Sequence, residues 1–278
     1  MNEAPLKHHF FAIVHKSIVS PSFYREVRHY PPAYALKFVV QMCLITALIS
    51  GAAFTYYALD ADRGLPSVVP RVFPGMSLNN GTLDPGRPTP YIPEKAAVTR
   101  FLNGLMCVPD AFDALPDSFI VVDTSSGAPK KFPGAQLVFS DRFFFIKTNS
   151  ATPMKTAYSR LLPAHDTIAF TQQGTELLLR KNVLGLFIWF FIQSGVFTTG
   201  TICVSIIFLT FAVYIFRVDK KEKAGLYFKK ACFAATPIFI GTNLVALSGT
   251  RVPNTWYVLL MIAVFVMVRG VKADKKAT

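Results

Sequence analysis

Four long uncharged, mostly apolar stretches constrain the fold of this 278-residue chain more than any other feature. They cover residues 38–59, 182–216, 231–250 and 252–268. About 20 apolar residues in a helix cross the roughly 30 Å hydrocarbon core of a bilayer. Charged residues make up only 16% of the chain, against about 25% in soluble domains. The sequence therefore predicts a membrane protein with four transmembrane helices.

The second stretch, residues 182–216, allows two interpretations. A single straight helix would measure about 52 Å at 1.5 Å per residue. A re-entrant pair with a turn near residues 195–200 is the alternative, although each half is short for a crossing. We expect one crossing, with residues 183–195 extending it outward or lying in the interface. In the fourth stretch, Trp256 and Tyr257 are expected to anchor one membrane interface.

Lys and Arg predict the orientation. Three segments that flank the spans, residues 1–37, 217–230 and 269–278, hold more than half of the 29 basic residues. Short basic segments stay in the cytoplasm, so both termini are expected there and residues 60–181 outside. The expected partner of this charge is a bilayer with anionic lipids rather than nucleic acid, because no recognition motif accompanies it. The candidate membrane-surface residues are Arg217, Lys220, Lys221, Lys223, Lys229 and Lys230.

The predicted fold is a four-helix α-helical transmembrane bundle with a small α+β extracytoplasmic domain inserted between spans 1 and 2. The expected parts are an amphipathic cytoplasmic segment (1–33), helix 1 (34–59), the outside domain (60–181), a long helix 2 (182–216), a basic loop (217–230), helix 3 (231–250), a short outside loop (251–254), helix 4 (255–269) and a basic cytoplasmic tail (270–278).

Shorter signals refine both soluble parts. Residues 5–19 have the pattern of a helix on the inner leaflet, and Ser20 is expected to cap a second short helix. In the outside domain we expect an extended segment over 60–93, with a turn at Asn80-Gly81. We also expect a helix over 94–106 and a final helix capped by Asp166. Strands are expected over 119–123 and 154–161, and two more within 136–148 on either side of a turn at Ser140-Asp141.

Candidate catalytic and metal patterns are incomplete. Asp123 begins an Asp-Thr-Ser-Ser-Gly run after an apolar strand, but aspartic-protease chemistry needs two carboxylates and the run occurs once. The histidines at 8, 9 and 15 have no nearby Cys or further His to complete a zinc site. Cys107 follows an apolar helix face and is expected in a core. The sequence predicts no catalytic residue, no metal and no cofactor.

The four stretches contain no Asp, Glu, Lys, Arg or His, and this weighs against proton-coupled transport. Polar residues within them are expected to bond neighbouring helices, or else to line a path. Pro237 is expected to kink the third span. The candidates for helix packing or path lining are Gln193, Thr198, Thr199, Pro237 and Asn243.

Four segments carry a family resemblance: SIVSPSFYREVR, FPGMSLNNGTL, FIVVDTSSG and YFKKACFAATPIF. In this order, over nearly the full length, they resemble the bacterial membrane protein family catalogued as domain-of-unknown-function family 1189. Some of its members are labelled maltodextrin-utilisation proteins. The last segment is also loosely similar to the Yip1-type membrane domain. The resemblance implies a bacterial inner-membrane protein with one large extracytoplasmic insert after the first span, and it supplies no catalytic residues.

Three functions remain open at this level. The first is a non-enzymatic membrane protein whose outside domain senses, binds or scaffolds an envelope or transport complex, with a membrane or periplasmic protein as partner. The second is a transporter subunit with a path between spans 2 and 3. The third is an extracytoplasmic hydrolase around Asp123. The ligand, the partner and the oligomeric state have no signal in the sequence.

Overall fold

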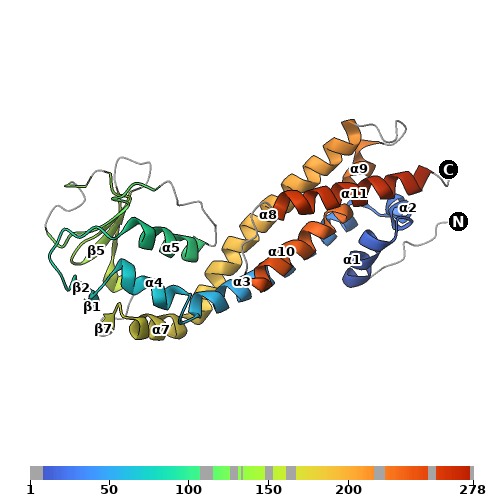
Figure 1. Ribbon diagram of the computed structural model, residues 1–278. Coiled ribbons are helices and arrows are strands. Elements are labelled where there is room, and N and C mark those ends of the chain that lie inside the picture. The colour runs from blue at the N-terminus through green and yellow to red at the C-terminus, as the bar shows by residue number, and fades with distance from the viewer. Residues whose placement is uncertain are drawn as a thin grey trace. The chain divides into compact units, whose positions relative to one another are not determined.

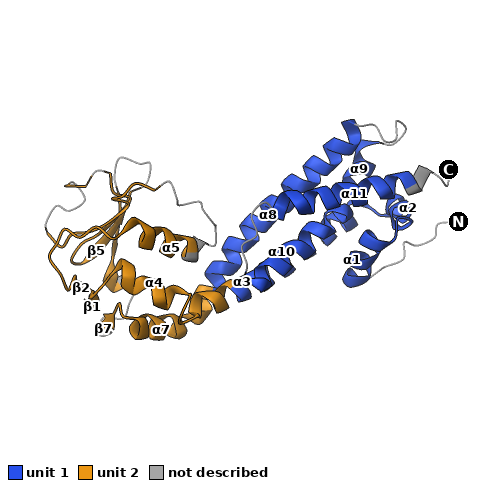
Figure 2. Ribbon diagram, in the orientation of Figure 1, with its two compact units in different colours: residues 1–53, 187–278 blue, residues 54–186 orange. Residues whose placement is uncertain are grey.

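The computed structural model describes residues 9–106, 115–125, 131–132, 134–147, 153–160, 167–215, 223–249 and 255–275. The chain divides into two compact units, coloured separately in Figure 2. The helical unit comprises Met1–Ala53 and Phe187–Thr278, and the mixed unit comprises Phe54–Leu186. The mixed unit is thus an insertion in the helical one.

Four helical stretches among the described residues are long and apolar enough to cross a membrane. They are α3 (Pro32–Leu59), α8 (Val183–Ile215), the pair α9–α10 from Ala224 to Ser248, and α11 (Thr255–Lys275) as far as Lys272 (Figure 1). The prediction of four candidate spans is therefore confirmed.

The long second stretch forms one helix. α8 runs for 33 residues without interruption, and residues 195–200 are helical like their neighbours. Its length is about 50 Å at 1.5 Å per residue, which exceeds the roughly 30 Å core of a bilayer. A turn at this position, and with it the re-entrant pair, does not occur.

The third stretch differs from the prediction in two ways. α9 (Ala224–Ala234) begins before residue 231, so Lys229 and Lys230 lie in a helix and not in a loop. The helix is then interrupted at Ala235, and α10 (Thr236–Ser248) follows with Pro237 in its first turn. Proline has no N–H to continue the hydrogen-bond ladder, which explains the interruption as the expected kink.

The N-terminal segment packs as part of the helical unit. α1 (Phe10–Val19) buries Ile13 and Ser17 and lies against α9 and α10. The next helix, α2 (Phe23–Glu26), begins after Ser22, so the N-cap position belongs to Ser22 and not to Ser20 as predicted. A 3-10 turn, η1 (Val27–His29), leads to α3. Of the predicted apolar face of α1, Ile13 is buried against neighbouring helices, whereas Phe10, Val14 and Ile18 are partly buried.

An aromatic cluster forms the core of this end of the helical unit. The Phe233 side chain in α9 is fully buried. Its ring centroid lies 5.0 Å from that of Phe38 in α3, 5.3 Å from Phe23 in α2 and 6.1 Å from Tyr30. One ring therefore connects the N-terminal segment, the first candidate span and the third.

The described strands of the mixed unit form two small sheets. The first has the order β2-β1-β7, all antiparallel, with β1 (Ser77–Asn79), β2 (Thr82–Asp84) and β7 (Thr167–Ala169). The second has the order β3-β4-β5-β6, with β3 (Ile120–Val122) parallel to β4 (Leu137–Phe139) and the others antiparallel: β5 (Phe143–Ile146) and β6 (Met154–Ala157). The predicted turns at Asn80-Gly81 and Ser140-Asp141 are confirmed, since each connects paired strands.

Helices α4, α5 and α7 accompany the sheets in the described part of this unit. α5 (Lys95–Met106) is as predicted, but α4 (Leu65–Val72) replaces part of the expected extended segment and packs against α5 and α7 (Gln172–Lys181). α4 buries residues at the helical spacing 65, 68, 69 and 72. The α7 cap is Thr171, whose hydroxyl accepts the Gly174 N–H. Asp166 and Cys107 lie outside the described residues.

Candidate functional site

Asn243 links two candidate spans inside the helical unit. Its side chain is 7% exposed in α10, and its amide nitrogen donates to Thr46 Oγ1 of α3 at 3.0 Å. The same nitrogen donates to the Phe239 carbonyl oxygen at 2.7 Å. The buried Asn243 Oδ1 has no hydrogen-bond partner in the described part of the chain. The amide therefore joins α10 to α3, which is the packing role that polar groups have between membrane helices.

The other predicted path residues do not share one face. Thr198 is buried in α8, whereas its neighbour Thr199 is exposed. Successive helical residues point about 100° apart, so one path cannot receive both side chains equally. Gln193 is partly buried one turn earlier on α8, and Pro237 is buried at the start of α10. The structure brings Asn243 to Thr46, a residue that sequence analysis had not singled out.

An open apolar pocket of about 390 Å³ lies between α8 and α11, with Trp256 on one wall. The Trp256 indole N–H donates to Ser205 Oγ of α8 at 3.3 Å. The indole therefore points into the helical unit, while Tyr257 beside it is mostly exposed. The remaining lining residues are Val196, Phe197, Gly200, Thr201 and Val204.

The candidate membrane-surface residues have different environments. Lys223 precedes α9 and is exposed. Lys229 donates from Nζ to the carbonyl oxygens of Arg28 at 2.9 Å and Tyr30 at 2.8 Å. Lys230 is fully buried. Arg217, Lys220 and Lys221 lie outside the described residues.

The two lysines of α9 are the residues that sequence analysis misplaced. Charged side chains are almost never fully buried unless they have partners. Lys229 finds its partners at the end of η1, about 200 residues earlier in the chain. No local pattern around residue 229 indicates such distant carbonyls. Lys229 thus attaches α9 to the end of η1, and Lys230 is buried within the helical unit.

In the mixed unit, Asp123 directly follows β3 and is 2% exposed. Its Oδ1 accepts the backbone N–H of Ser125 at 2.9 Å, and Lys131 Nζ donates to Ser125 Oγ at 2.8 Å. This geometry is that of a turn closing a strand. Among the described residues, no group of three or more His, Cys, Asp and Glu side chains is arranged to hold a metal ion.

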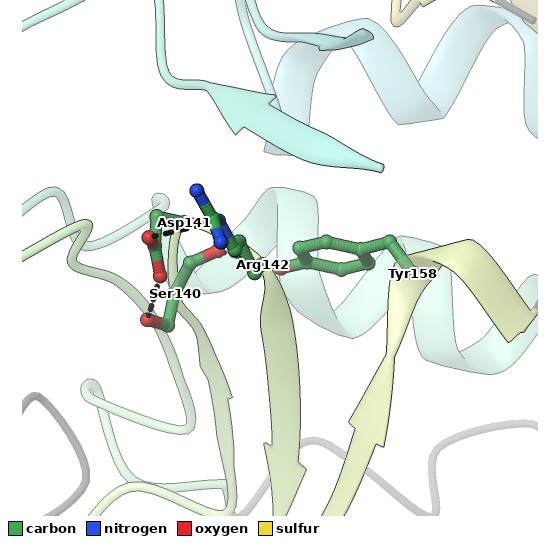
Figure 3. Close-up of polar contacts among 4 residues, drawn as sticks. All are labelled: Ser140, Asp141, Arg142 and Tyr158. Carbon is green, nitrogen blue, oxygen red and sulfur yellow. Dashed lines mark hydrogen bonds and ion pairs between the residues drawn. The ribbon is translucent and has the colours of Figure 1, made fainter. Parts of the chain in front are cut away.

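A second polar group joins the strands of the larger sheet, as Figure 3 shows. The Tyr158 hydroxyl donates to the Ser140 carbonyl oxygen at 3.0 Å. Ser140 Oγ donates to Asp141 Oδ1 at 3.1 Å, and Asp141 lies within ion-pair distance of Arg142. The Asp141 carbonyl oxygen accepts the Leu83 N–H of β2, so this turn connects the two sheets.

Burial raises the pKa of Tyr158 well above its ordinary value, and the negative charge of Asp141 raises it further. The stability that the neutral hydroxyl contributes is fully present below about pH 10 and is lost as the pH rises above that value. We expect Tyr158→Phe to cost about 1 kcal/mol at neutral pH and to reduce the alkaline loss. Urea unfolding at about pH 8 and about pH 11, read from a label at Met154→Cys, measures both. If the free energy of unfolding falls between these two pH values as much in Tyr158→Phe as in the wild type, the loss of stability at high pH comes from other tyrosines.

Comparisons with protein-family models, curated proteins and solved structures give no match to this chain.

Proposed function

We propose that this chain is a non-enzymatic inner-membrane protein of a bacterium, and that its outside domain senses, binds or scaffolds an envelope or transport complex. Under this proposal both termini are cytoplasmic and residues 60–181 are outside. A membrane or periplasmic protein and anionic lipids are the partners. The bacterial assignment rests on the resemblance to family 1189.

One observation carries the proposal. A compact unit with two sheets is inserted between two helices that are long and apolar enough to cross a membrane, and its ends at Phe54 and Leu186 lie within those helices. Interior polar groups such as Asn243 and Trp256 bond to neighbouring helices. The helical unit thus has the features of a packed anchor, and the mixed unit is the part available to a soluble ligand or partner.

The orientation is tested with single cysteines in a variant that lacks the four native ones. Met154→Cys in β6 and Lys223→Cys before α9 both replace exposed side chains. A thiol reagent that cannot cross membranes is expected to label Met154→Cys in intact spheroplasts, and Lys223→Cys only after lysis. Labelling of Lys223→Cys in intact spheroplasts contradicts the proposed topology.

The function is tested by gentle purification of the full chain from its native membrane, followed by mass spectrometry. A stoichiometric partner belonging to the envelope or to a transport complex is expected. An unrelated tagged four-span protein, purified in parallel, identifies nonspecific partners. A chain that purifies alone, or only with copies of itself, contradicts the scaffold function.

A transporter subunit is the second candidate, because interrupted helices occur at transporter binding sites and α9–α10 is interrupted at Ala235. The two candidates predict different results for Asn243→Leu. If Asn243 joins helices, the substitution costs about 1 kcal/mol of stability and leaves partner binding unchanged. The test measures maltodextrin uptake into proteoliposomes by the wild type and by the double variant Asn243→Leu/Gln193→Leu. We expect background uptake in both. Uptake by wild type that the double variant abolishes would instead support transport.

A further inference from the structure

The interruption at Ala235 is also the place where the N-terminal segment contacts the third candidate span. Ser17 Oγ of α1 lies 2.9 Å from Thr236 Oγ1, the first residue of α10. Both side chains are fully buried, although 219 positions separate them in the chain. The contact therefore connects α1 to the interruption in this span.

The Thr236 hydroxyl replaces the bond that Pro237 cannot make. Pro237 has no N–H, so the carbonyl oxygen of Phe233, four residues earlier, loses its usual backbone donor. Thr236 Oγ1 donates to this oxygen at 2.6 Å. Ser17, Thr236 and the Phe233 carbonyl thus form a continuous chain of polar contacts at the interruption.

The N-terminal segment is attached on both sides of the interruption. On the α9 side, Lys229 Nζ donates to the carbonyl oxygens of Arg28 and Tyr30. On the α10 side, the Phe10 ring packs edge to face on Phe239, with centroids 5.9 Å apart. The segment therefore bridges two helices that are separated by a residue outside either of them.

A third attachment fixes the segment to α11. The ring of Tyr24 occupies the space beside Gly270, where an added Cβ would lie only 2.5 Å from Tyr24 Cδ2. The Tyr24 hydroxyl donates to the Ser17 carbonyl oxygen at 2.9 Å. A side chain at position 270 would displace Tyr24, and Tyr24 is connected to Ser17.

We infer that residues 9–30 form a latch that sets the angle between α9 and α10. The latch holds the two helices through separate contacts, and at the interruption between them the Thr236 side chain supplies the hydrogen bond to the Phe233 carbonyl that Pro237 cannot supply. Displacing the latch changes the angle. A ligand or partner that acts on the N-terminal segment is thereby coupled to the conformation of the third span.

The test measures the distance between spin labels at Gly225 of α9 and Leu244 of α10, by pulsed electron paramagnetic resonance on the full chain in nanodiscs. Both positions are exposed. The variant Gly270→Leu displaces Tyr24 without changing either helix. A rotation of α9 by about 20° moves the Gly225 label by about 5 Å, so a shift of at least this size is expected.

A further label at His15, exposed on α1, reports whether the latch has detached. The matched control is Gly200→Leu in α8, because nothing lies within 4 Å of a Cβ added at Gly200. We expect Gly270→Leu to raise the mobility of the His15 label and to shift the α9–α10 distance, and Gly200→Leu to do neither. A mobile His15 label with an unchanged distance overturns the inference.

Milder variants keep the test decisive if Gly270→Leu does not fold. Ser17→Ala removes only the hydroxyl at the interruption, and Lys229→Met removes only the donor to η1. The combination is expected to broaden the α9–α10 distance distribution. A distribution identical to that of the wild type overturns the latch.

Discussion

Phe233→Ala is expected to lower the free energy of unfolding of the helical unit by about 3 kcal/mol, because the substitution removes a fully buried ring and leaves a cavity. The ring contacts Phe23, Tyr30 and Phe38, which belong to different segments of the chain. In a bilayer the loss is one of packing, since lipid tails are as apolar as the ring itself. The same change thus tests whether the N-terminal segment belongs to the core.

The matched control is Phe211→Ala in α8, whose side chain is 63% exposed. It makes the same chemical change on the outer surface of the unit, where losses stay within about 0.5 kcal/mol. Reversible unfolding in mixed micelles, followed by circular dichroism, compares both variants with the wild type. Equal losses in the two variants would contradict the aromatic cluster as the core of this unit.

The spans were predictable because their signal is local. An uncharged run of sufficient length indicates a helix whatever its neighbours are, and α3, α8 and α11 each contain most of such a run. The bounds differ, however, because α3 begins before its run at Pro32 and α11 continues to Lys275, into the segment predicted as a basic tail. The same criterion misplaced the start of α9. It excludes charged residues, and Lys229 is stabilised inside the helical unit by carbonyl oxygens of Arg28 and Tyr30 that lie far away in the sequence.

In the mixed unit, too, features set by neighbouring residues were predictable, and contacts between residues far apart in the sequence were not. The turn at Asn80-Gly81 was predictable because both residues adopt positive φ, which Asn and Gly tolerate best. The pairing of β7 with β1 was not, since the two strands are far apart in the sequence. α4 was missed because Pro66 and Pro70 suggested an extended chain, although its buried residues follow the helical spacing.

The candidate site was predictable in its residue types and not in its contacts. Asn243 and Pro237 stood out as a polar residue and a helix breaker in apolar runs. Asn243 bonds to Thr46 of α3, and the position next to Pro237 is contacted by Ser17 of α1 through Thr236. Both contacts come from other helices. Serine and threonine are common in membrane helices, so nothing in the sequence distinguishes these from the rest.

Gly64→Ala is expected to destabilise the mixed unit by about 3 kcal/mol, the upper part of the usual range for overpacking. Gly64 precedes α4, and its N–H donates to the Asp60 carbonyl oxygen at 2.8 Å. A Cβ at this position would lie 2.5 Å from the carbonyl oxygens of Tyr57 and Asp60, and 2.6 Å from that of Ala58. These atoms belong to the backbone that ends α3, so relief requires a shift of the chain between α3 and α4.

Gly185→Ala in α8 is the matched control for this prediction. Nothing lies within 4 Å of a Cβ added at Gly185, and alanine is favoured over glycine inside a helix by about 1 kcal/mol. Hydrogen exchange of the β1 and β2 amides in the full chain is expected to rise in Gly64→Ala and to stay as in the wild type in Gly185→Ala. Exchange that is equally slow in both variants would show that the connection between α3 and α4 tolerates a side chain. In that case the close approach of three carbonyl oxygens would not be what fixes the start of α4.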